Sequence, residues 1–380
     1  MKLELTDDQK AAQLAYRAFV RTEIIPHAGR FDQEQQTPFE LIRKLAHAGY
    51  LGAVVPAADG GTGQDMLTFG LLNEALGRGC SSVRSLLTVH SMVTYALYKW
   101  GNKYQKAFWL PRLIAGDVIG AFGLSEPSVG SDAKSIATTA TAHADGFVLD
   151  GHKKWTTYGQ IADVFLVFAN YAGKLSAFLV ERTTPGFVCK PIQGMLGTRA
   201  SMLAELHFDT CLIPKDHLVG GVGFGLATVA TSALDIGRYS VAWGSVGIVR
   251  ACLEESLHYA ATRRQGGALL KDHQLIRQML TNMTTDLHAA RLLCCQAGYR
   301  KDTGDPNTVM ETWIAKYFAS VAANRAASDA VQIHGANGCS SDYAVQRYMR
   351  DAKIMEIIEG SSQIQQINIA DYAYMEHSQN

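Results

Sequence analysis

The last part of the chain carries a carboxylate in a setting that suits proton abstraction. Glu359 follows the apolar pair Ile357 and Ile358 and precedes Gly360. A carboxylate with apolar neighbours is poorly solvated, which raises its pKa toward the range of a general base. The alternative is an acid at the start of a helix, where the helix dipole favours a negative charge. The residues alone leave both interpretations open.

Two earlier segments carry groups that could meet a phosphate and an aromatic ring. In segment 121–132, Gly130 permits close backbone approach and the Ser131 hydroxyl can donate to a phosphate. An ordinary loop would show the same pattern. Trp155 stands in the run Lys153–Gly159, and an aromatic side chain in such a place is most often used for core packing.

These segments together resemble the acyl-CoA dehydrogenase family. The sequence R-D-A-K-I followed by E-G-S-S-Q-I-Q at 350–365 is similar to the family's C-terminal signature. The resemblance implies that Glu359 removes the substrate α-proton while a hydride leaves Cβ for flavin N5. Some members carry the base on an earlier helix, in an L-D-x-E-R segment, but Gly237 stands there in this chain. Asp235 and Arg238 match residues at the entrance for the acyl thioester, with a structural ion pair as the alternative.

The resemblance also implies an FAD site. Segment 121–132 matches the family's T/S-E-P-x-x-G-S-D loop, and Lys153–Gly159 matches K-x-W-I-T-N-G with Thr156 and Tyr158 as departures. The residues implied on one subunit are Phe122, Leu124 and Ser125 against the isoalloxazine, Gly130 and Ser131 at the pyrophosphate, Trp155 over the ring and Thr157 near N5.

A further set is implied to reach the FAD of a neighbouring subunit. Arg263 matches the Arg of a Y-x-x-x-R-x-x-F-G segment, in which Gly266 replaces the aromatic residue. Gln332 and Ala336 belong to a turn similar to Q-I-F-G-G-N-G. On the adenosine side, the matching residues are Ser361 and Gln363. The resemblance therefore implies a homodimer or homotetramer with shared FAD sites.

One helical segment limits which acyl groups the protein could accept. Arg84 and Thr88 share a face at i, i+4 in an otherwise apolar run. An Arg at a helix start that extends its charge to solvent is the alternative. The run resembles glutaryl-CoA dehydrogenase, where an Arg and a hydroxyl hold a carboxylate at the far end of the pocket. A pocket closed by a cation disfavours long alkyl chains, which would leave the charge unpaired, so we expect a short, polar acyl group.

Within the family, segments 84–90 and 154–163 look most like the dehydrogenases of polyketide and nonribosomal peptide clusters. Those enzymes act on acyl-carrier-protein thioesters and help to make aminomalonyl or hydroxymalonyl extender units, as in the colibactin and zwittermicin pathways. The alternatives are a glutaryl-CoA or other short-chain acyl-CoA dehydrogenase and, more remotely, a non-catalytic protein on the same fold. The electron acceptor implied is an electron-transfer flavoprotein or oxygen.

The secondary structure expected around these residues changes twice along the chain, from helices to strands and back to helices. Capping signals at Thr6–Gln9 and Thr37–Glu40 open helices in an all-α domain over 1–117. Short runs rich in β-branched and aromatic residues, divided by turns such as Asp150-Gly151, predict a β-barrel domain over 118–222. Long helical segments predict a four-helix bundle over 223–380. The fold class expected is an α+β multidomain acyl-CoA dehydrogenase fold.

Composition limits the partners. The chain of 380 residues has 35 basic and 35 acidic side chains, a balance that gives no support for nucleic-acid binding. No segment approaches the ~20 apolar residues of a membrane span, and the charged start 1–8 lacks the apolar stretch of a signal peptide. The seven cysteines are scattered, without metal-ligand or disulfide spacing. We expect a cytoplasmic protein without a membrane partner or a metal site.

Overall fold

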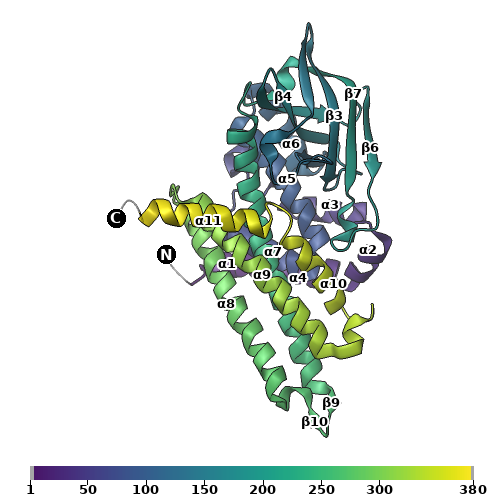
Figure 1. The fold of residues 1–380 in the computed structure, drawn as a ribbon, viewed down its shortest axis with the longest axis vertical. Coiled ribbons are helices and arrows are strands. Elements are labelled where there is room, and N and C mark those ends of the chain that lie inside the picture. Colours follow the sequence, from purple (N-terminus) through teal and green to yellow (C-terminus); the bar gives the residue numbers. More distant parts are fainter. Residues whose placement is uncertain (1–3, 378–380) are drawn as a thin grey trace.

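The computed structural model describes residues 4–377, and its first part is helical (Figure 1). The predicted capping box is present at α1: the Thr6 hydroxyl accepts from the Gln9 N–H at 3.2 Å, and the Gln9 side chain accepts from the Thr6 N–H at 3.0 Å. The helices of this part are α1 (Asp7–Phe19), α2 (Ala28–Glu34), α3 (Phe39–His47), α4 (Met66–Gly79), α5 (Ser81–Trp100) and α6 (Lys103–Ala115).

The second predicted capping box is wrong. Pro38 is the N-cap of α3 and no side chain caps that end. The Thr37 hydroxyl instead donates to the Ala200 carbonyl at 2.9 Å and lies 2.8 Å from the Tyr158 hydroxyl. Thr37 is buried where the helical part meets the β domain, and a buried hydroxyl needs a partner that only this tertiary contact supplies.

A twisted sheet forms the middle part, in the strand order β6-β7-β3-β2-β4-β5-β8 with β1 parallel to β4. Strands β4 and β5 are buried along most of their length and form its core. The strands are β1 (Gly120–Gly123), β2 (Thr139–His143), β3 (Gly146–Thr156), β4 (Val164–Tyr171), β5 (Lys174–Glu181), β6 (Phe187–Pro191), β7 (Ala204–Pro214) and β8 (Leu218–Val219).

The turn predicted at Asp150-Gly151 is wrong, because β3 continues through both residues. The register between β3 and β7 shifts between Leu149 and Gly151, which marks a β-bulge. A Cβ on Gly151 would lie 2.6 Å from the Thr138 hydroxyl oxygen. The glycine therefore serves close strand packing and not chain reversal.

Helices return in the last part and enclose α7, which packs against α4, α5, α8 and α9. Figure 1 places the β domain at one end of the molecule and the hairpin β9–β10 at the other. None of the helices within residues 4–377 is long and apolar enough to cross a membrane. The elements are α7 (Thr231–Thr262), β9 (Arg264–Gln265), β10 (Ala268–Leu269), α8 (Gln274–Asp302), α9 (Thr308–His334), α10 (Val345–Met355) and α11 (Ser362–His377).

The predicted fold class, with a helical, a β and a second helical part, is confirmed by this element order. The first and last three residues of the predicted terminal domains lie outside the described range. Segment 350–365 connects the parts: the Arg350 guanidinium donates to Asp32 on α2 at 3.0 Å, and the Asp351 carboxylate accepts from the Thr198 N–H of the β domain at 2.6 Å. These contacts fix the end of α10, and with it the loop that carries Glu359.

Candidate functional site

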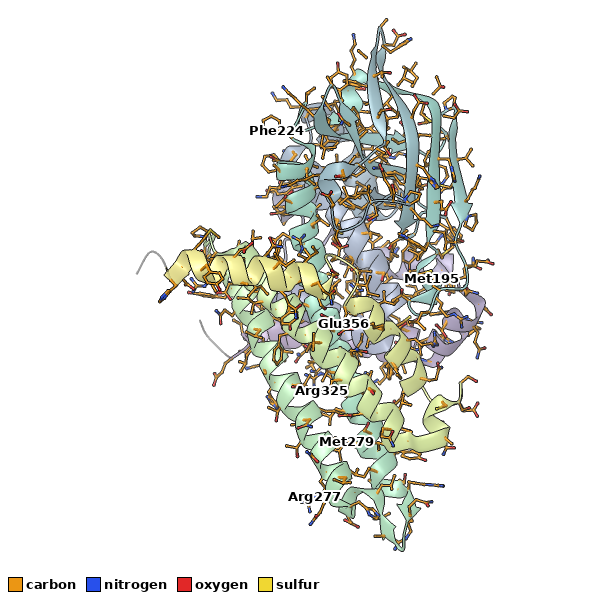
Figure 2. All side chains as sticks on the ribbon, in the orientation of Figure 1. Met195, Phe224, Arg277, Met279, Arg325 and Glu356 are labelled. Atoms are coloured by element: carbon orange, nitrogen blue, oxygen red, sulfur yellow. The ribbon has the colours of Figure 1, made fainter. Side chains whose placement is uncertain are left out.

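Glu359 lies in the loop between α10 and α11, near the middle of the molecule. Figure 2 labels Glu356, three residues earlier, where these two helices meet. The backbone of Glu359 is left-handed at φ 56°, and Gly360 follows at φ 91°. A non-glycine residue in this region is uncommon and is typically held there by its surroundings. The loop therefore presents Glu359 in a conformation that local propensity would not choose.

The Glu359 carboxylate packs against α7 at Gly237. A Cβ on Gly237 would lie 2.5 Å from Glu359 Oε2, so the glycine creates the space that the carboxylate occupies. Oε2 is buried without a hydrogen-bond partner among the described residues. The Ser361 hydroxyl, not Glu359, accepts from the Ile364 N–H in the first turn of α11. This arrangement favours the general-base interpretation over the helix-terminal one.

Burial raises the pKa of Glu359 above its ordinary value. The nearby cations Arg238, Lys316 and Arg84 limit that rise in pKa. A carboxylate with a raised pKa and an unpartnered oxygen is suited to accept a proton near neutral pH.

Three side chains donate to the backbone carbonyls of Glu359 and Gly360, in the loop between α10 and α11 that we call the base loop. Lys316 on α9, whose side chain is fully buried, donates to the Gly360 carbonyl at 2.7 Å. Arg238 donates to the Glu359 carbonyl at 3.1 Å, and Gln365 Nε2 lies 3.3 Å from both carbonyls. Burial lowers the pKa of Lys316 to about 8, although the charge of Glu359 opposes this. The cations thus contact the loop backbone and leave Glu359 Oε2 without a partner.

Arg84 is fully buried at 0% exposure, which rules out a side chain that extends to solvent. Its guanidinium donates to the Thr88 hydroxyl at 2.7 Å and to the Ser240 hydroxyl at 3.3 Å. Its Nε is buried without a partner among the described residues. Burial lowers the pKa of Arg84 to about 10. A Cβ on Gly244 would lie 2.2 Å from Arg84 Cδ, so the glycine leaves the space on α7 that the Arg84 side chain occupies.

The predicted entrance residues do not pair with each other. Asp235 forms an ion pair with Lys301, whereas the Arg238 guanidinium lies over the Trp313 ring, 4.6 Å from its centroid. Arg238 therefore has a direct contact with the base loop, and Asp235 lies one helical turn away and faces α8.

The segments predicted to hold the flavin lie side by side on the β domain. The Lys154 N–H donates to the Ser125 carbonyl at 2.9 Å. Beneath them, the fully buried Lys153 donates to Glu126 at 2.7 Å and to the Leu124 carbonyl at 3.1 Å. Burial lowers the pKa of Lys153 to about 8, against the effect of Glu126. This internal pair anchors the loop.

The residues on the outside of these segments fit a planar cofactor. Trp155 is 48% exposed, with its backbone at φ 66°, so the core-packing interpretation of this residue is wrong. Thr157, Phe122, Leu124 and Ser125 are half-buried, and the turn at Gly130 and Ser131 is exposed. The hydroxyl of Thr156 is buried without a partner among the described residues. An exposed indole beside exposed and orphaned hydroxyls is a suitable surface for FAD.

The second predicted set lies outside the β domain. Arg263 follows α7 and leads into the hairpin β9–β10, far from β3 in Figure 1. Gln332 and Ala336 are exposed. Their turn lies against the end of α7, because the His334 ring stacks on Tyr259 at a centroid distance of 4.2 Å. Arg263 and Trp155 are therefore not brought together within one chain. Ser361 and Gln363 lie at the start of α11, half-buried and exposed respectively.

Gly266 has a backbone role in this hairpin. Gly266 and Gly267 have φ values of 57° and 79°, which a two-residue turn with two left-handed positions requires. The loss of the aromatic residue follows from this tight hairpin.

Several residues of the site were missed from the sequence. Lys316 and Ser240 lie in long helices whose composition gives no sign of a polar cluster, and their partners are distant in the chain. Tyr158 was noted only as a departure, yet its buried hydroxyl lies 2.8 Å from that of Thr37 and donates to the Ser82 carbonyl at 2.9 Å. A buried tyrosine hydroxyl implies partners, but the sequence does not identify them.

Comparison with known proteins agrees with this geometry. Family models match three consecutive ranges: acyl-CoA dehydrogenase N-terminal domain at residues 6–117, middle domain at 121–211 and C-terminal domain at 224–373. An acyl-CoA dehydrogenase of Bacillus subtilis (strain 168) is 38% identical over 376 residues, which covers 97% of this chain and 99% of the relative.

Two solved structures bear on the acyl end. Glutaryl-coenzyme A dehydrogenase in complex with glutaryl-CoA is 34% identical, with a TM-score of 0.94 over 97% of this chain and 96% of that one. FkbI, described as serving biosynthesis of the methoxymalonyl extender unit of the Fk520 polyketide immunosuppressant, is 33% identical, with a TM-score of 0.87 over 96% and 99%.

Proposed function

The chain belongs to the acyl-CoA dehydrogenase family and is an FAD-dependent oxidoreductase that acts on acyl thioesters, and we propose that its substrate is a short, polar acyl group tethered to a carrier protein. The observation that carries the short, polar acyl group of this proposal is Arg84. Its buried guanidinium is neutralised by no carboxylate among the hydrogen bonds and ion pairs of residues 4–377. A buried charge without a counter-charge is costly, so a polar or anionic substrate group would stabilise it.

Proton abstraction is assigned to Glu359. Its buried carboxylate takes the Cα proton, and Oε2 makes no hydrogen bond to the cations that hold the backbone. We expect the Glu359 N–H to donate to the thioester oxygen, which stabilises the enolate-like charge. When bound, FAD supplies the acceptor for the hydride that leaves Cβ. Asp235 and Arg238 are assigned to the path by which the thioester enters.

The same geometry suits an aldehyde at Cβ. A hydrated aldehyde that loses its Cα proton to Glu359 and its Cβ hydride to the cofactor becomes an enediol, which tautomerises to the carboxylic acid. This two-electron oxidation would give an aminomalonyl or hydroxymalonyl thioester, and the new carboxylate would face Arg84 and Thr88. Similarity to FkbI, linked to a methoxymalonyl extender unit, supports this chemistry.

Glutaryl-CoA is the second candidate substrate. The Arg84–Thr88 pair, joined at 2.7 Å, would bind its distal carboxylate equally well, and the glutaryl-CoA dehydrogenase structure is similar over nearly the whole chain. The two candidates differ in what delivers the thioester, a carrier protein or CoA.

The FAD site is proposed to be completed by a second subunit. Trp155 and Ser131 of one subunit would bind one part of the cofactor. Arg263 and Gln332 of a neighbouring subunit would bind another part of the same cofactor. This supports a homodimer or homotetramer. An electron-transfer flavoprotein or oxygen is the proposed acceptor, and the cytoplasm the proposed location.

Anaerobic flavin bleaching tests the proposal. The FAD-loaded enzyme is mixed separately with glutaryl-CoA, a series of neutral short acyl-CoA thioesters, and carrier-bound 3-oxo thioesters derived from serine and glycerate. Bleaching by the carrier-bound substrates alone is expected. Bleaching by glutaryl-CoA would assign the enzyme to CoA metabolism, and faster bleaching by butyryl-CoA than by any polar substrate would contradict the role of Arg84. No bleaching by any thioester would favour a non-catalytic protein.

A further inference from the structure

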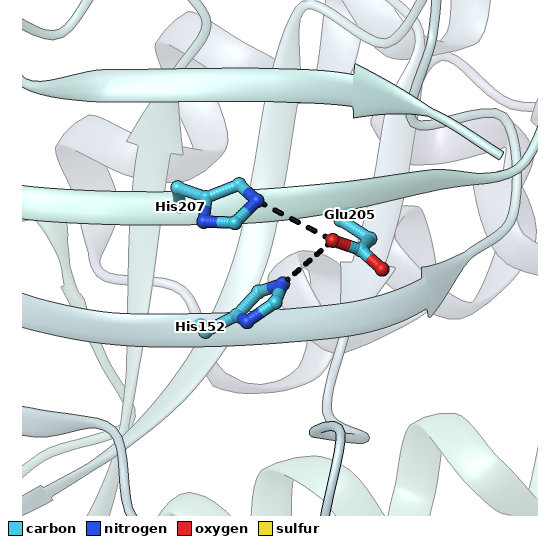
Figure 3. Close-up of side chains that lie close together, drawn as sticks. All are labelled: His152, Glu205 and His207. Atoms are coloured by element: carbon cyan, nitrogen blue, oxygen red, sulfur yellow. Dashed lines mark hydrogen bonds and ion pairs between the residues drawn. The ribbon is translucent and has the colours of Figure 1, made fainter.

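Two histidines and a carboxylate meet on one face of the β domain, away from Glu359. His152 on β3 lies directly opposite His207 on β7 in the antiparallel register, and Glu205 precedes His207 by two residues on the same face. The two imidazole rings are stacked, with centroids 4.0 Å apart and planes 24° from parallel. Figure 3 shows both rings turning their Nε2 atoms toward the same carboxylate.

The distances in this cluster suit a metal ion. His152 Nε2 lies 3.1 Å and His207 Nε2 lies 3.4 Å from Glu205 Oε2, and the three ligand atoms are within 4.8 Å of one another. Bonds of about 2.0–2.2 Å to Zn²⁺ place tetrahedral ligand atoms roughly 3.3–3.5 Å apart. We propose that His152, Glu205 and His207 bind a divalent transition-metal ion such as Zn²⁺, with solvent at the remaining position.

The alternative is a network of hydrogen bonds without an ion, and it satisfies the two histidines unequally. His152 Nε2 lies 3.1 Å from Glu205 Oε2 in a hydrogen bond, whereas the buried His207 Nε2 reaches the same oxygen only at 3.4 Å and without hydrogen-bond geometry. A poorly satisfied buried nitrogen costs free energy. A metal ion placed between the three side chains would bind this nitrogen directly.

The surrounding charges orient the ligands. Lys154 binds the other carboxylate oxygen, Glu205 Oε1, at 2.9 Å, which leaves Oε2 directed at the histidines. Such contacts to the outside of a ligand are a regular part of metal sites.

The proposed ion would connect β3 to β7 immediately before Lys154 and Trp155. Lys154 lies over the Trp155 ring at 4.8 Å from its centroid, so Glu205, Lys154 and Trp155 form a continuous line of contacts. Metal binding would therefore stiffen the strand end that carries the exposed indole.

The test is equilibrium dialysis of the FAD-loaded, tag-free enzyme against Zn²⁺. All proteins carry Cys339→Ser, because Cys339 is an exposed thiol that could bind the metal. We expect one Zn²⁺ per chain, with affinity reduced at least about tenfold in His207→Gln. His143→Gln is the matched control, since His143 lies 3.7 Å from Asp145 in a surface pair that no third ligand joins within residues 4–377, and Zn²⁺ binding by this variant should equal that of the parent.

A second metal and a second variant keep the test decisive. Cu²⁺ in the same site should show hyperfine coupling to two nitrogens in electron paramagnetic resonance, reduced to one in His207→Gln. Glu205→Gln, which retains both imidazoles, should also weaken Zn²⁺ binding if His207→Gln fails to fold. Stoichiometric binding that is unchanged in both variants, or no saturable binding by the parent, would overturn the proposal.

Discussion

The surroundings of Glu359 and the surface of the β domain that we propose to face the flavin are built in opposite ways. The base loop is surrounded within a single chain: Lys316, Arg238 and Gln365 contact its carbonyls, and Arg84 lies in the buried interior nearby. The flavin-facing residues are open. Trp155 is exposed, and Arg263 lies at the other end of the molecule (Figure 1).

The difference shows where preorganisation resides. The group that accepts a proton must be held in place before substrate arrives, because its geometry and pKa determine the rate. The surface that binds the cofactor can remain open, because FAD and a second subunit would complete it. Substitutions near Glu359 should therefore change the rate of flavin reduction and leave FAD affinity unchanged. Substitutions on the β domain or at Arg263 should change FAD affinity.

The largest effect is expected for Glu359→Gln. Loss of the general base should slow anaerobic flavin reduction by about 10²–10⁴-fold, with the FAD content unchanged, because Glu359 packs against Gly237 on α7 and the amide of Gln has nearly the same shape. Stopped-flow absorbance measures the reduction rate.

Glu356→Gln is the matched control. Glu356 lies three residues earlier, pairs with Lys353 at 2.7 Å and accepts from Asn324 at 3.1 Å, so the reduction rate of this variant should stay within a few-fold of the parent. Equal losses in both variants would mean that the loop has been disturbed as a whole and would remove the basis for assigning the base to Glu359.

Lys153→Met should destabilise the β domain and weaken FAD binding by removing a buried ion pair. It leaves Glu126 buried without its cation, which should lower the free energy of unfolding by about 3–5 kcal/mol and weaken FAD binding through the loop that follows Glu126. Lys154→Met is the neighbouring control. Its partly exposed pair with Glu205 should contribute no more than about 1 kcal/mol. Denaturant unfolding of the apoprotein compares them, and similar losses would contradict the anchoring role.

Local signals were predictable from the sequence, and long-range ones were not. The Thr6 capping box involves residues three apart and forms as expected. Thr37 carries the same pattern, but its hydroxyl is taken by Tyr158 and Ala200, far along the chain. Gly151 similarly resembles a turn residue, although the reason for it is a contact with Thr138.

The candidate site divides in the same way. Glu359 and Arg84 could be identified because their segments resemble those of a known family. Lys316 could not, because it stands on α9 and its partner Gly360 lies 44 residues later. His152 and His207 are more than fifty residues apart in the sequence, and only the register of the sheet makes them neighbours.

Arg263→Gln tests the division of the FAD site between subunits. If Arg263 donates to the FAD of a neighbouring copy, its loss should cost about 1.5–3 kcal/mol of binding free energy. The dissociation constant for FAD should then rise roughly tenfold to hundredfold. Because Arg263 is exposed in the single chain, apoprotein stability should change by less than about 0.5 kcal/mol.

Arg264→Gln is the control for this position. Arg264 donates to the Gly267 carbonyl of its own hairpin at 2.9 Å and should leave FAD affinity unchanged. Reconstitution of the apoprotein with FAD, followed by fluorescence, gives both dissociation constants. Unchanged affinity in Arg263→Gln would argue for a cofactor site contained within one chain.

The smallest effect, and the sharpest for the base region, is expected for Lys316→Met. Its ammonium group limits the rise in the pKa of Glu359, so its removal should raise that pKa further. A base acts in its ionised form, so the rate of flavin reduction rises with pH through the pKa of Glu359. In the variant this rise should occur at higher pH, with a loss of up to about tenfold on the acidic side and recovery on the alkaline side.

Lys353→Met controls for the loss of a lysine close to the same loop. Lys353 is exposed on α10 and pairs with Glu356, so the pH profile should keep its midpoint. A role for Lys316 in packing alone would lower the rate equally at every pH, because a displaced Glu359 would be poorly placed whether ionised or not. A shifted midpoint with an unchanged alkaline plateau requires that Lys316 act on Glu359 through its charge, which is the distinction between a preorganised base and a merely buried one.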